Sequence, residues 1–234
     1  MFCLLNKRKR RRARIDESIP VADMRYVVID TELTGLDEKR DSIVSIGAIK
    51  MAGGKIELQD TFYRLVNPET ALTAKSVIIH QITPSEVEKK PAIEQVLAEF
   101  LQFCGNDVVI GHCVSIDLSF IDRETKKTSS GTMQNPVLDT SAIYQWIQRR
   151  YSSEKALPGS FSDSGLYEIA QYFGIPVNGA HNALMDAFIT AQVFQRFLPM
   201  LIKGGIERIG DLLILGNPSK GGDRSGAVRE MYSL

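Results

Sequence analysis

Residues 26–36 read Tyr26-Val-Val-Ile-Asp-Thr-Glu-Leu-Thr-Gly-Leu36, an apolar, β-branched run that passes into two carboxylates and a glycine. The run Tyr26–Asp30 is typical of a buried strand. Two more strands are predicted at Ile43–Met51 and Ile56–Val66, and the Gly53-Gly54 pair between them favours a hairpin turn. Three strands joined in this way form a meander, and the first of them is expected near the centre of a sheet.

Helical and strand patterns alternate after this meander. Thr83, Pro84 and Glu86 form a helix-start signature of N-cap, N1 and N3 residues, and Pro91–Cys104 has the apolar spacing of a helix. Antiparallel strands followed by strand–helix alternation predict an α/β domain with a mixed five-stranded sheet covered by helices. Further strands are expected at Asp107–Gly111 and Val137–Asp139, and further helices at Ser115–Thr125, Ser141–Tyr151, Leu166–Phe173 and Asn182–Leu201.

The two ends of the chain differ from its body in composition. Residues 1–22 are predicted to be a basic extension, residues 23–203 the α/β domain, and residues 204–234 a second extension. Seven of the 28 basic residues lie in residues 7–14, which leaves 21 basic against 28 acidic residues elsewhere. A dense basic arm on an acidic body favours contact with nucleic acid, an anionic surface or an acidic partner. A solvated tail without a specific partner is the alternative.

Composition and targeting signals limit the class of protein. The hydrophobic fraction of 44% and the charged fraction of 24% are ordinary for a globular protein. No apolar run approaches the roughly 20 residues that a membrane helix needs, and Met1–Leu5 precedes its basic run, the reverse of a secretory signal. Three cysteines without metal-ligand spacing suit a reducing compartment. We therefore expect a cytoplasmic protein that does not enter a membrane.

Asp30 and Glu32 are the first candidates for a chemical role. Strand side chains alternate between faces, so these two carboxylates point the same way, about 6.7 Å apart along the chain. Two like charges repel, and burial increases the repulsion, so a shared divalent cation is the simplest way to make the pair favourable. Gly35 allows a turn that brings backbone N–H groups close to a ligand. The alternative is a solvated turn, in which Asp, Thr and Gly are common.

Asp117 lies where a predicted buried strand runs into a helix, in the segment Gly111–Leu118. Open α/β sheets bind ligands at such strand ends, and a carboxylate in the first helical turn faces that crevice. Asp117 can equally be an acid that complements the positive end of the helix dipole.

Asp186 and His181 flank the start of the helix predicted at Asn182–Leu201. Alanines at 183, 187 and 191 form a small-residue stripe that lets this helix lie close against the sheet. In such an apolar stretch an unpaired carboxylate at Asp186 would be costly. An imidazole can take a proton from water near neutral pH, which suits His181 for a general base. A capping or structural role for His181 is the alternative.

The conjunction of these residues predicts more than any one of them. Four carboxylates gathered at one point carry a charge that two divalent cations neutralise, and two such ions can stabilise the attacking and leaving oxygens of a phosphodiester. Hard, oxygen-rich ligands select Mg²⁺ or Mn²⁺ rather than zinc.

The motifs resemble those of the DEDDh branch of the DnaQ-like exonucleases, the family that includes the proofreading epsilon subunit of bacterial DNA polymerase III. Ile29–Leu36 is similar to the first family motif, Gly111–Leu118 to the second and His181–Ala187 to the third. Ser76–Thr83 looks like a segment that family members carry between the first two motifs, and Asp139-Thr140 matches a further common dipeptide.

The resemblance covers about residues 24–200 and implies an RNase H-like fold with helices on both faces of the sheet. It implies that the four carboxylates hold two metal ions and that His181 acts as general base. Thr34, Gly35 and Leu36 would cradle the terminal nucleotide, with Leu36 against its base and His80 nearby. Leu33 and Cys113 depart from the family pattern, where a small polar residue and Asn are usual, and both flank the expected substrate site.

The expected activity is that of a 3′→5′ exonuclease releasing nucleoside monophosphates from single-stranded DNA 3′ ends, with a polymerase or regulatory protein as partner. Three alternatives stay open on the sequence: a 3′→5′ exoribonuclease, a non-catalytic nucleic-acid-binding module, and a metal-dependent phosphatase that uses the same carboxylates.

Overall fold

The computed structural model describes residues 15–127, 133–151 and 165–218. The basic run at residues 7–14, the polar stretch 152–164 for which the sequence predicts a mobile loop, and residues 219–234 lie outside the described part of the chain.

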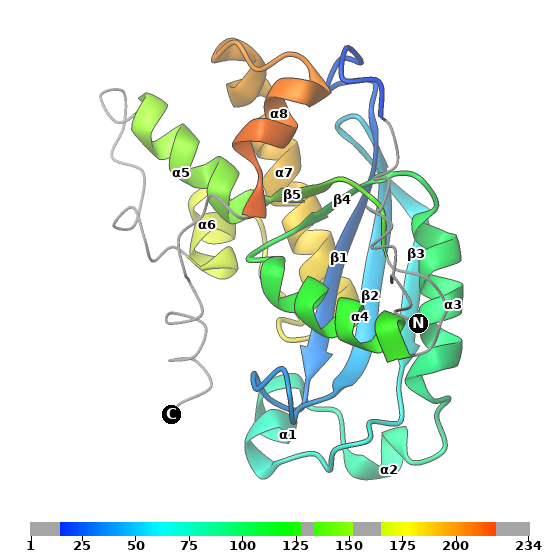
Figure 1. Ribbon diagram of the computed structural model, residues 1–234. Coiled ribbons are helices and arrows are strands. Elements are labelled where there is room, and N and C mark those ends of the chain that lie inside the picture. The colour runs from blue at the N-terminus through cyan, green and yellow to red at the C-terminus, as the bar shows by residue number, and fades with distance from the viewer. Residues whose placement is uncertain (1–14, 128–132, 152–164, 219–234) are drawn as a thin grey trace, which may run out of the picture.

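One five-stranded sheet organises the fold, with the strand order β3-β2-β1-β4-β5 (Figure 1). Strand β1 pairs antiparallel with β2 and parallel with β4, so the sheet is mixed and β1 is central. The predicted mixed sheet and the predicted central position of its first strand are therefore confirmed. The strands are β1 (Arg25–Leu33), β2 (Ile43–Ala52), β3 (Lys55–Leu65), β4 (Val108–Gly111) and β5 (Val137–Asp139).

Helices cover both faces of this sheet, as the sequence predicts. Figure 1 shows α3 and α4 on one face and α5, α6 and α7 on the other. The N-cap predicted at Thr83 is confirmed, since its backbone N–H donates to Glu86 Oε2 at 2.7 Å. The helices are α1 (Ala74–His80), α2 (Pro84–Val87), α3 (Ile93–Cys104), α4 (Ser115–Lys127), α5 (Thr140–Tyr151), α6 (Leu166–Tyr172), α7 (Ala183–Lys203) and α8 (Ile209–Leu215).

The alternation of side chains along β1 divides the core into two layers. Tyr26 and Val28 pack in the cluster that includes α7, whereas Val27 and Ile29 pack in the cluster that includes α3 and α4. All four are at most 1% exposed. Because side chains along a strand alternate between its two faces, residues 30 and 32 point toward α7 and residue 31 points toward α4.

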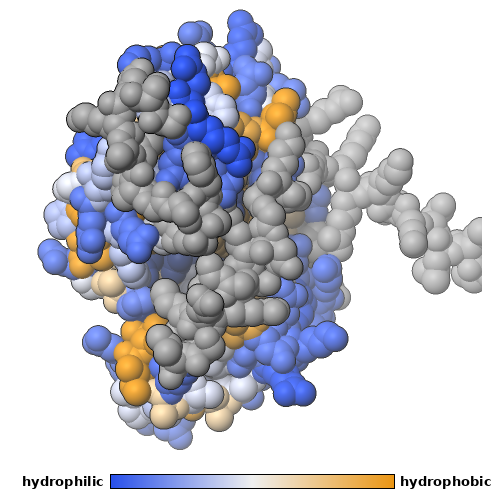
Figure 2. Space-filling view, turned by 90° about the vertical axis from the view of Figure 1, so that its left-hand side faces the viewer, coloured by the Kyte–Doolittle hydropathy of each residue, from blue (hydrophilic) through white to orange (hydrophobic). Residues whose placement is uncertain are grey.

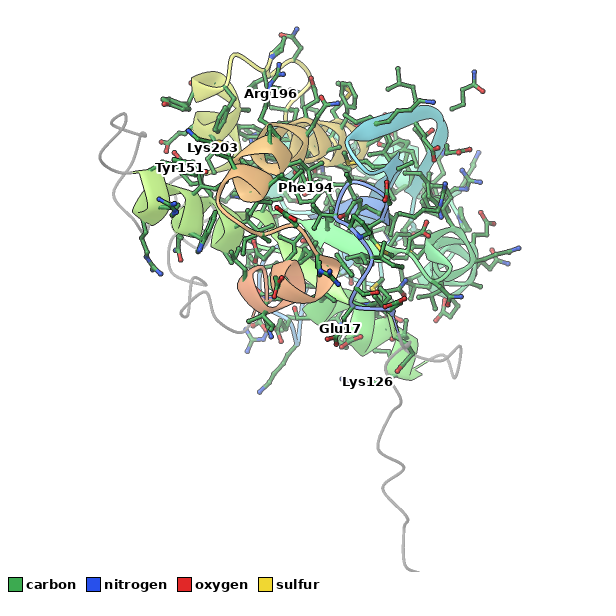
Figure 3. The ribbon with its side chains drawn as sticks, turned by 90° about the horizontal axis from the view of Figure 1, so that it is seen from above. Glu17, Lys126, Tyr151, Phe194, Arg196 and Lys203 are labelled. Atoms are coloured by element: carbon green, nitrogen blue, oxygen red, sulfur yellow. The ribbon has the colours of Figure 1, made fainter. Side chains whose placement is uncertain are left out.

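Helix α7 lies close against the sheet because its sheet-facing residues are small at one end and aromatic at the other. Its alanines at 183, 187 and 191 are fully buried. Phe194 meets the ring of Tyr26 edge-on at 5.1 Å between ring centroids. Figure 3 shows Phe194 in the interior and Arg196 at the outer side of the helix. The C-terminal end is tied to α5, since the Tyr151 hydroxyl donates to the Met200 carbonyl at 2.7 Å.

The predicted boundaries at residues 22 and 203 leave out residues that pack into the core. Val21 is 1% exposed, and Ile209 and Leu212 of α8 are fully buried. The backbone N–H of Val21 donates to the Glu207 carbonyl at 2.8 Å, next to an antiparallel bridge between residues 20 and 208. The folded unit therefore includes described residues of both predicted extensions. The first and last residues of the folded unit stay a prediction.

The surface of one side of the molecule is shown in Figure 2. Where described residues are visible there, they are mostly hydrophilic, and the hydrophobic ones form small separate patches. Among the helices that the structure describes, none has the length and apolar character needed to cross a membrane.

Candidate active site

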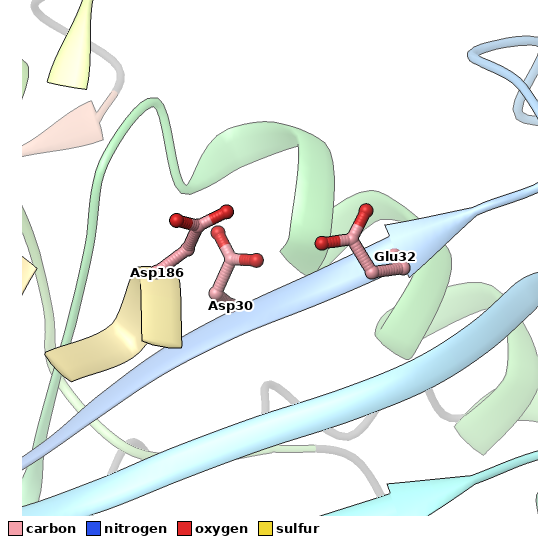
Figure 4. Close-up of side chains that lie close together, drawn as sticks. All are labelled: Asp30, Glu32 and Asp186. Atoms are coloured by element: carbon pink, nitrogen blue, oxygen red, sulfur yellow. The ribbon is translucent and has the colours of Figure 1, made fainter. Parts of the chain in front are cut away.

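Three of the predicted carboxylates meet at the end of β1. Asp30 and Glu32 on β1 and Asp186 on α7 each place a carboxylate oxygen within 4.8 Å of the others. Figure 4 shows the carboxylate of Asp30 between those of Asp186 and Glu32. Glu32 is 4% exposed and Asp186 is 5% exposed, so the group is largely shielded from water.

A glycine on the neighbouring strand brings Asp186 to this position. Gly47 of β2 is the register partner of Asp30. A Cβ atom at residue 47 would overlap the backbone of Ala183 and Leu184. The first turn of α7 therefore rests directly on β2 beside Asp30, at a distance that only glycine permits.

The start of α7 is also held by its N-cap. The Asn182 side-chain oxygen accepts hydrogen bonds from the backbone N–H groups of Leu184 at 3.2 Å and Met185 at 3.3 Å. Its amide group donates to the Tyr63 hydroxyl of β3 at 3.3 Å. These contacts link the turn that carries Asp186 to the edge strand of the sheet.

Asp117 approaches from the opposite face, in the first turn of α4. It is 6% exposed, and the hydroxyl of Thr31 donates to its Oδ1 at 2.6 Å. Asp117 is not part of the group of three within 4.8 Å. Its negative charge nevertheless contributes to raising the pKa of Asp30 and of Glu32, so the fourth predicted carboxylate lies beside the other three.

Burial and nearby negative charges raise the pKa values of these carboxyl groups. Burial, followed by the charges of Asp186 and Asp117, raises the pKa of Glu32 to about 8. Burial raises the pKa of Asp117 to about 7 against the opposing hydrogen bond from Thr31, and raises the pKa of Asp30 well above its ordinary value. None of the ion pairs made by described Lys and Arg residues involves these four carboxylates.

The donor set fits divalent cations. Asp186 Oδ1 is buried and has no hydrogen-bond partner among the described residues, although its Oδ2 accepts two hydrogen bonds. A buried carboxylate oxygen without a partner is costly unless a cation or water satisfies it. Converging carboxylates with raised pKa values and an unsatisfied oxygen are ligands suited to a hard divalent cation.

His181 directly precedes Asn182, the N-cap of α7, and has a φ of 62°, which is uncommon for residues other than glycine. Its backbone N–H contacts Asp186 Oδ2 and the Tyr167 hydroxyl, each at 3.0 Å. The structure thus places the predicted base, His181, next to the predicted metal ligand Asp186, and the His181 backbone N–H connects the two.

Tyr167, in the first turn of α6, is a site residue that the sequence reasoning missed. Its hydroxyl donates to Asp186 Oδ2 at 2.8 Å, and its ring meets the His181 ring edge-on at 5.3 Å between centroids. No local sequence pattern marks Tyr167, because its partners His181 and Asp186 lie 14 and 19 residues further along the chain.

The predicted nucleotide-binding residues Thr34, Gly35 and Leu36 come together along a cleft of about 1010 Å³. The Thr34 hydroxyl donates to Asp41 Oδ1 at 2.9 Å, and Asp41 Oδ2 accepts from the backbone N–H of Asp37 at 2.8 Å. Asp41, which the sequence analysis did not single out, thus closes the loop that forms one wall. The opposite wall includes Thr73, Lys75 and Ser76, around the start of α1.

His80 and Cys113 are not among the residues that line this cleft. His80 ends α1 and is buried. Its Nδ1 accepts from the backbone N–H of Ile82, and its Nε2 has no hydrogen-bond partner within the described ranges. Burial lowers the pKa of His80, and the neighbouring His181 lowers it further. The backbone N–H of Cys113 donates to Asp139 Oδ1 at 3.0 Å. Their substrate roles stay predictions.

Comparison with known proteins shows the family to which the chain belongs. A family model described as Exonuclease (RNase_T) matches residues 27–194, and the chain belongs to this family. The protein is therefore a nuclease, a metal-dependent hydrolase, and the predicted resemblance to the DnaQ-like exonucleases is confirmed.

Two relatives show how the chain compares in length. It is 36% identical over 200 residues to DNA polymerase III subunit epsilon of Aquifex aeolicus, with 85% of this chain and 92% of that protein covered. It is 34% identical over 190 residues to the PolC-type DNA polymerase III of Thermotoga maritima. That match covers 81% of this chain but only 13% of the polymerase.

Solved structures confirm the predicted RNase H-like fold. E. coli exonuclease I in complex with a dT13 oligonucleotide superposes with a TM-score of 0.65 at 16% identity, covering 77% of this chain and 43% of that one. Cell-death related nuclease 4 (CRN-4) superposes with a TM-score of 0.63 at 16% identity, covering 76% of this chain and 65% of that one.

Proposed function

We propose that this protein is a 3′→5′ exonuclease that releases nucleoside monophosphates from DNA 3′ ends. The proposal rests on one observation above all, the buried group formed by Asp30, Glu32 and Asp186 with Asp117 beside it. Family membership and the match to a polymerase epsilon subunit over 92% of its length support it.

Mg²⁺ or Mn²⁺ is the proposed cofactor, with two ions held by the four carboxylates. Such ions supply positive charge that stabilises both the attacking and the leaving oxygen of a phosphodiester. The raised pKa values of Glu32 and Asp117 support this assignment, because an adjacent cation removes the cost of ionising buried carboxyl groups. Asp186 Oδ1, which is buried and accepts no hydrogen bond from a described residue, is a ligand atom in this proposal.

The chain's own residues divide the remaining work. His181 takes a proton from the attacking water, whose oxygen forms the new bond to phosphorus while the bond to the 3′ oxygen breaks. The leaving oxygen, which is the 3′ oxygen of the preceding nucleotide, keeps the electron pair and takes up a proton from solvent water. Thr34, Gly35 and Leu36 hold the terminal nucleotide in the cleft, with the side chain of Leu36 against the base. His80 and Cys113, which do not line the cleft itself, are proposed to lie beside that nucleotide.

The proposed substrate is a single-stranded 3′ end, and the proposed partner is a polymerase. The first is supported by the fold shared with exonuclease I, whose structure contains a dT13 oligonucleotide. The second is supported by the relatives, which are a polymerase subunit and a polymerase. The cytoplasmic location expected from the sequence stays a prediction.

A gel assay on 5′-labelled single strands tests this function. DNA and RNA of one sequence are incubated with Mg²⁺, Mn²⁺ or EDTA, using the wild type, Asp117→Asn and Asp122→Asn. Asp122 is the matched control, because it lies on the same helix and does not belong to the carboxylate group at the end of β1.

The expected result is a metal-dependent ladder that shortens DNA from the 3′ end. Asp117→Asn should lower the rate by orders of magnitude and leave the fold intact, whereas Asp122→Asn should cleave like the wild type. Faster cleavage of RNA would reassign the substrate. An Asp117→Asn protein as fast as the wild type, or a wild type that cleaves neither polymer, would refute the proposal.

A further inference from the structure

Tyr167 makes three contacts at one end of the carboxylate group. Its hydroxyl donates to Asp186 Oδ2 at 2.8 Å, accepts from the His181 backbone N–H at 3.0 Å, and lies 3.4 Å from His181 Nδ1. Its ring supports the imidazole edge-on, at 5.3 Å between centroids. Tyr167 therefore touches the side chain of one proposed metal ligand and both the main chain and the ring of the proposed base.

The single proton of the Tyr167 hydroxyl determines which atom is the donor in its contact with His181 Nδ1. A tyrosine hydroxyl has one O–H to donate, whereas a carboxylate can only accept. Because that proton is directed to Asp186, the hydroxyl can only accept from His181 Nδ1. The ring nitrogen that faces Tyr167 must then carry a proton. In a neutral imidazole, this leaves Nε2 unprotonated and able to accept a proton.

The same contacts assign different tasks to the two oxygens of Asp186. Oδ2 accepts from both the Tyr167 hydroxyl and the His181 backbone N–H. Oδ1 is buried and has no hydrogen-bond partner in the part of the chain that the structure describes. Two donors on one oxygen hold the carboxylate in a single rotation and leave the other oxygen available for a cation.

We propose that Tyr167 is a positioning residue of the nuclease, which fixes His181 in the Nδ1–H tautomer and holds Asp186 with Oδ1 available as a ligand. This inference deepens the proposed function and rests on it for the role of His181 as base. It adds a residue that acts on the reaction only through two others.

Nitrogen NMR of the metal-free protein tests the tautomer without reference to activity. The chain contains three histidines, so ¹⁵N labelling of histidine gives a small set of ring signals, and a His181→Gln variant identifies those of His181. The ¹⁵N shifts distinguish a protonated from an unprotonated ring nitrogen. We expect neutral His181 in the Nδ1–H form in the wild type. An Nε2–H form in the wild type would overturn the proposal, whatever any variant does.

Tyr167→Phe tests the positioning itself, because it removes one oxygen and keeps the ring. We expect kcat to fall about 10- to 100-fold, as is typical when a residue that hydrogen-bonds to a metal ligand is removed. KM should stay within about twofold, because the nucleotide cleft is unchanged. His181 should shift toward the Nε2–H form. Tyr172→Phe is the matched control, since Tyr172 lies on the same helix and its ring packs on Phe173.

Tyr167→4-aminophenylalanine restores an N–H donor on the same ring and should recover much of the lost kcat. A Tyr167→Phe protein with the wild-type tautomer and kcat within twofold would refute the positioning role. A wild type that cleaves no nucleic acid would refute the proposed function instead, and the NMR result would still decide the link between Tyr167 and His181.

Discussion

Replacing Gly47 with alanine tests how closely the site depends on the contact between α7 and β2. The added Cβ would lie well inside 3.0 Å of the Ala183 and Leu184 backbone, whereas ordinary van der Waals contact begins at 3.4 Å. No side chain can yield there, so the start of the helix must retreat. Overpacking of this kind costs about 1–3 kcal/mol of folding free energy. Restoring normal contact requires a shift of about 1 Å, and a displacement of that size costs about 100-fold in rate.

Two measurements on Gly47→Ala separate these effects. Thermal unfolding should show Tm lowered by about 2–4 °C for each kcal/mol lost. Exonuclease assays, run well below Tm, should show kcat reduced by about 100-fold, because Asp186 moves away from Asp30 while the protein stays folded. KM should change little, since Gly47 does not line the nucleotide cleft.

Gly54→Ala is the matched control on the hairpin that follows β2. Its Cβ would meet only Leu198 Cδ1, at 3.5 Å, which is ordinary contact with the end of a side chain. Both Tm and kcat should stay near wild-type values. A Gly47→Ala protein with wild-type kcat would show that the helix can retreat without moving Asp186, and would refute this account of the site.

Two further perturbations test the cap and the charge of the site. Asn182→Ala removes the acceptor for two backbone N–H groups, so unfolding should become easier by about 1 kcal/mol; an unchanged Tm would show that the cap contributes nothing. The carboxyls of Glu32 and Asp117 have pKa values raised to about 8 and about 7, so their stabilising contribution is present at low pH and is lost as pH rises through those values. Tm of the metal-free protein should therefore fall from pH 6 to pH 9, and added Mg²⁺ should raise Tm more at pH 9; a rise in metal-free Tm over this range would contradict the assignment.

The strands and the acidic residues could be predicted because their signals are local. The β-branched run at Tyr26–Asp30 marks a buried strand by itself, and period-two alternation then places Glu32 on the same side as Asp30. The stripe of alanines that begins at Ala183 indicates a helix lying close to a sheet, which is how α7 packs. Each inference needs only neighbouring residues.

The contacts that complete the site could not be predicted, because they join distant parts of the chain. Tyr167 reaches Asp186 from a different helix, and nothing in its own neighbourhood distinguishes it from Tyr172. Gly47 reads as an ordinary strand residue until the backbone of α7 is placed over it. Helix α8 lies in the segment assigned to the C-terminal extension, and the burial of its Ile209 and Leu212 depends on contacts with distant parts of the chain.

The bridge between residues 20 and 208 ties the segment that leads into β1 to the segment that leads into α8. Beyond the bridge the chain continues into α8, where Ile209 and Leu212 are fully buried. Burial and backbone hydrogen bonding, rather than position in the sequence, decide whether a chain tolerates truncation. A protein shortened to residues 23–203 would therefore lose buried residues and this pairing near the start of β1, whereas the carboxylates lie toward the end where β1 stops (Figure 1).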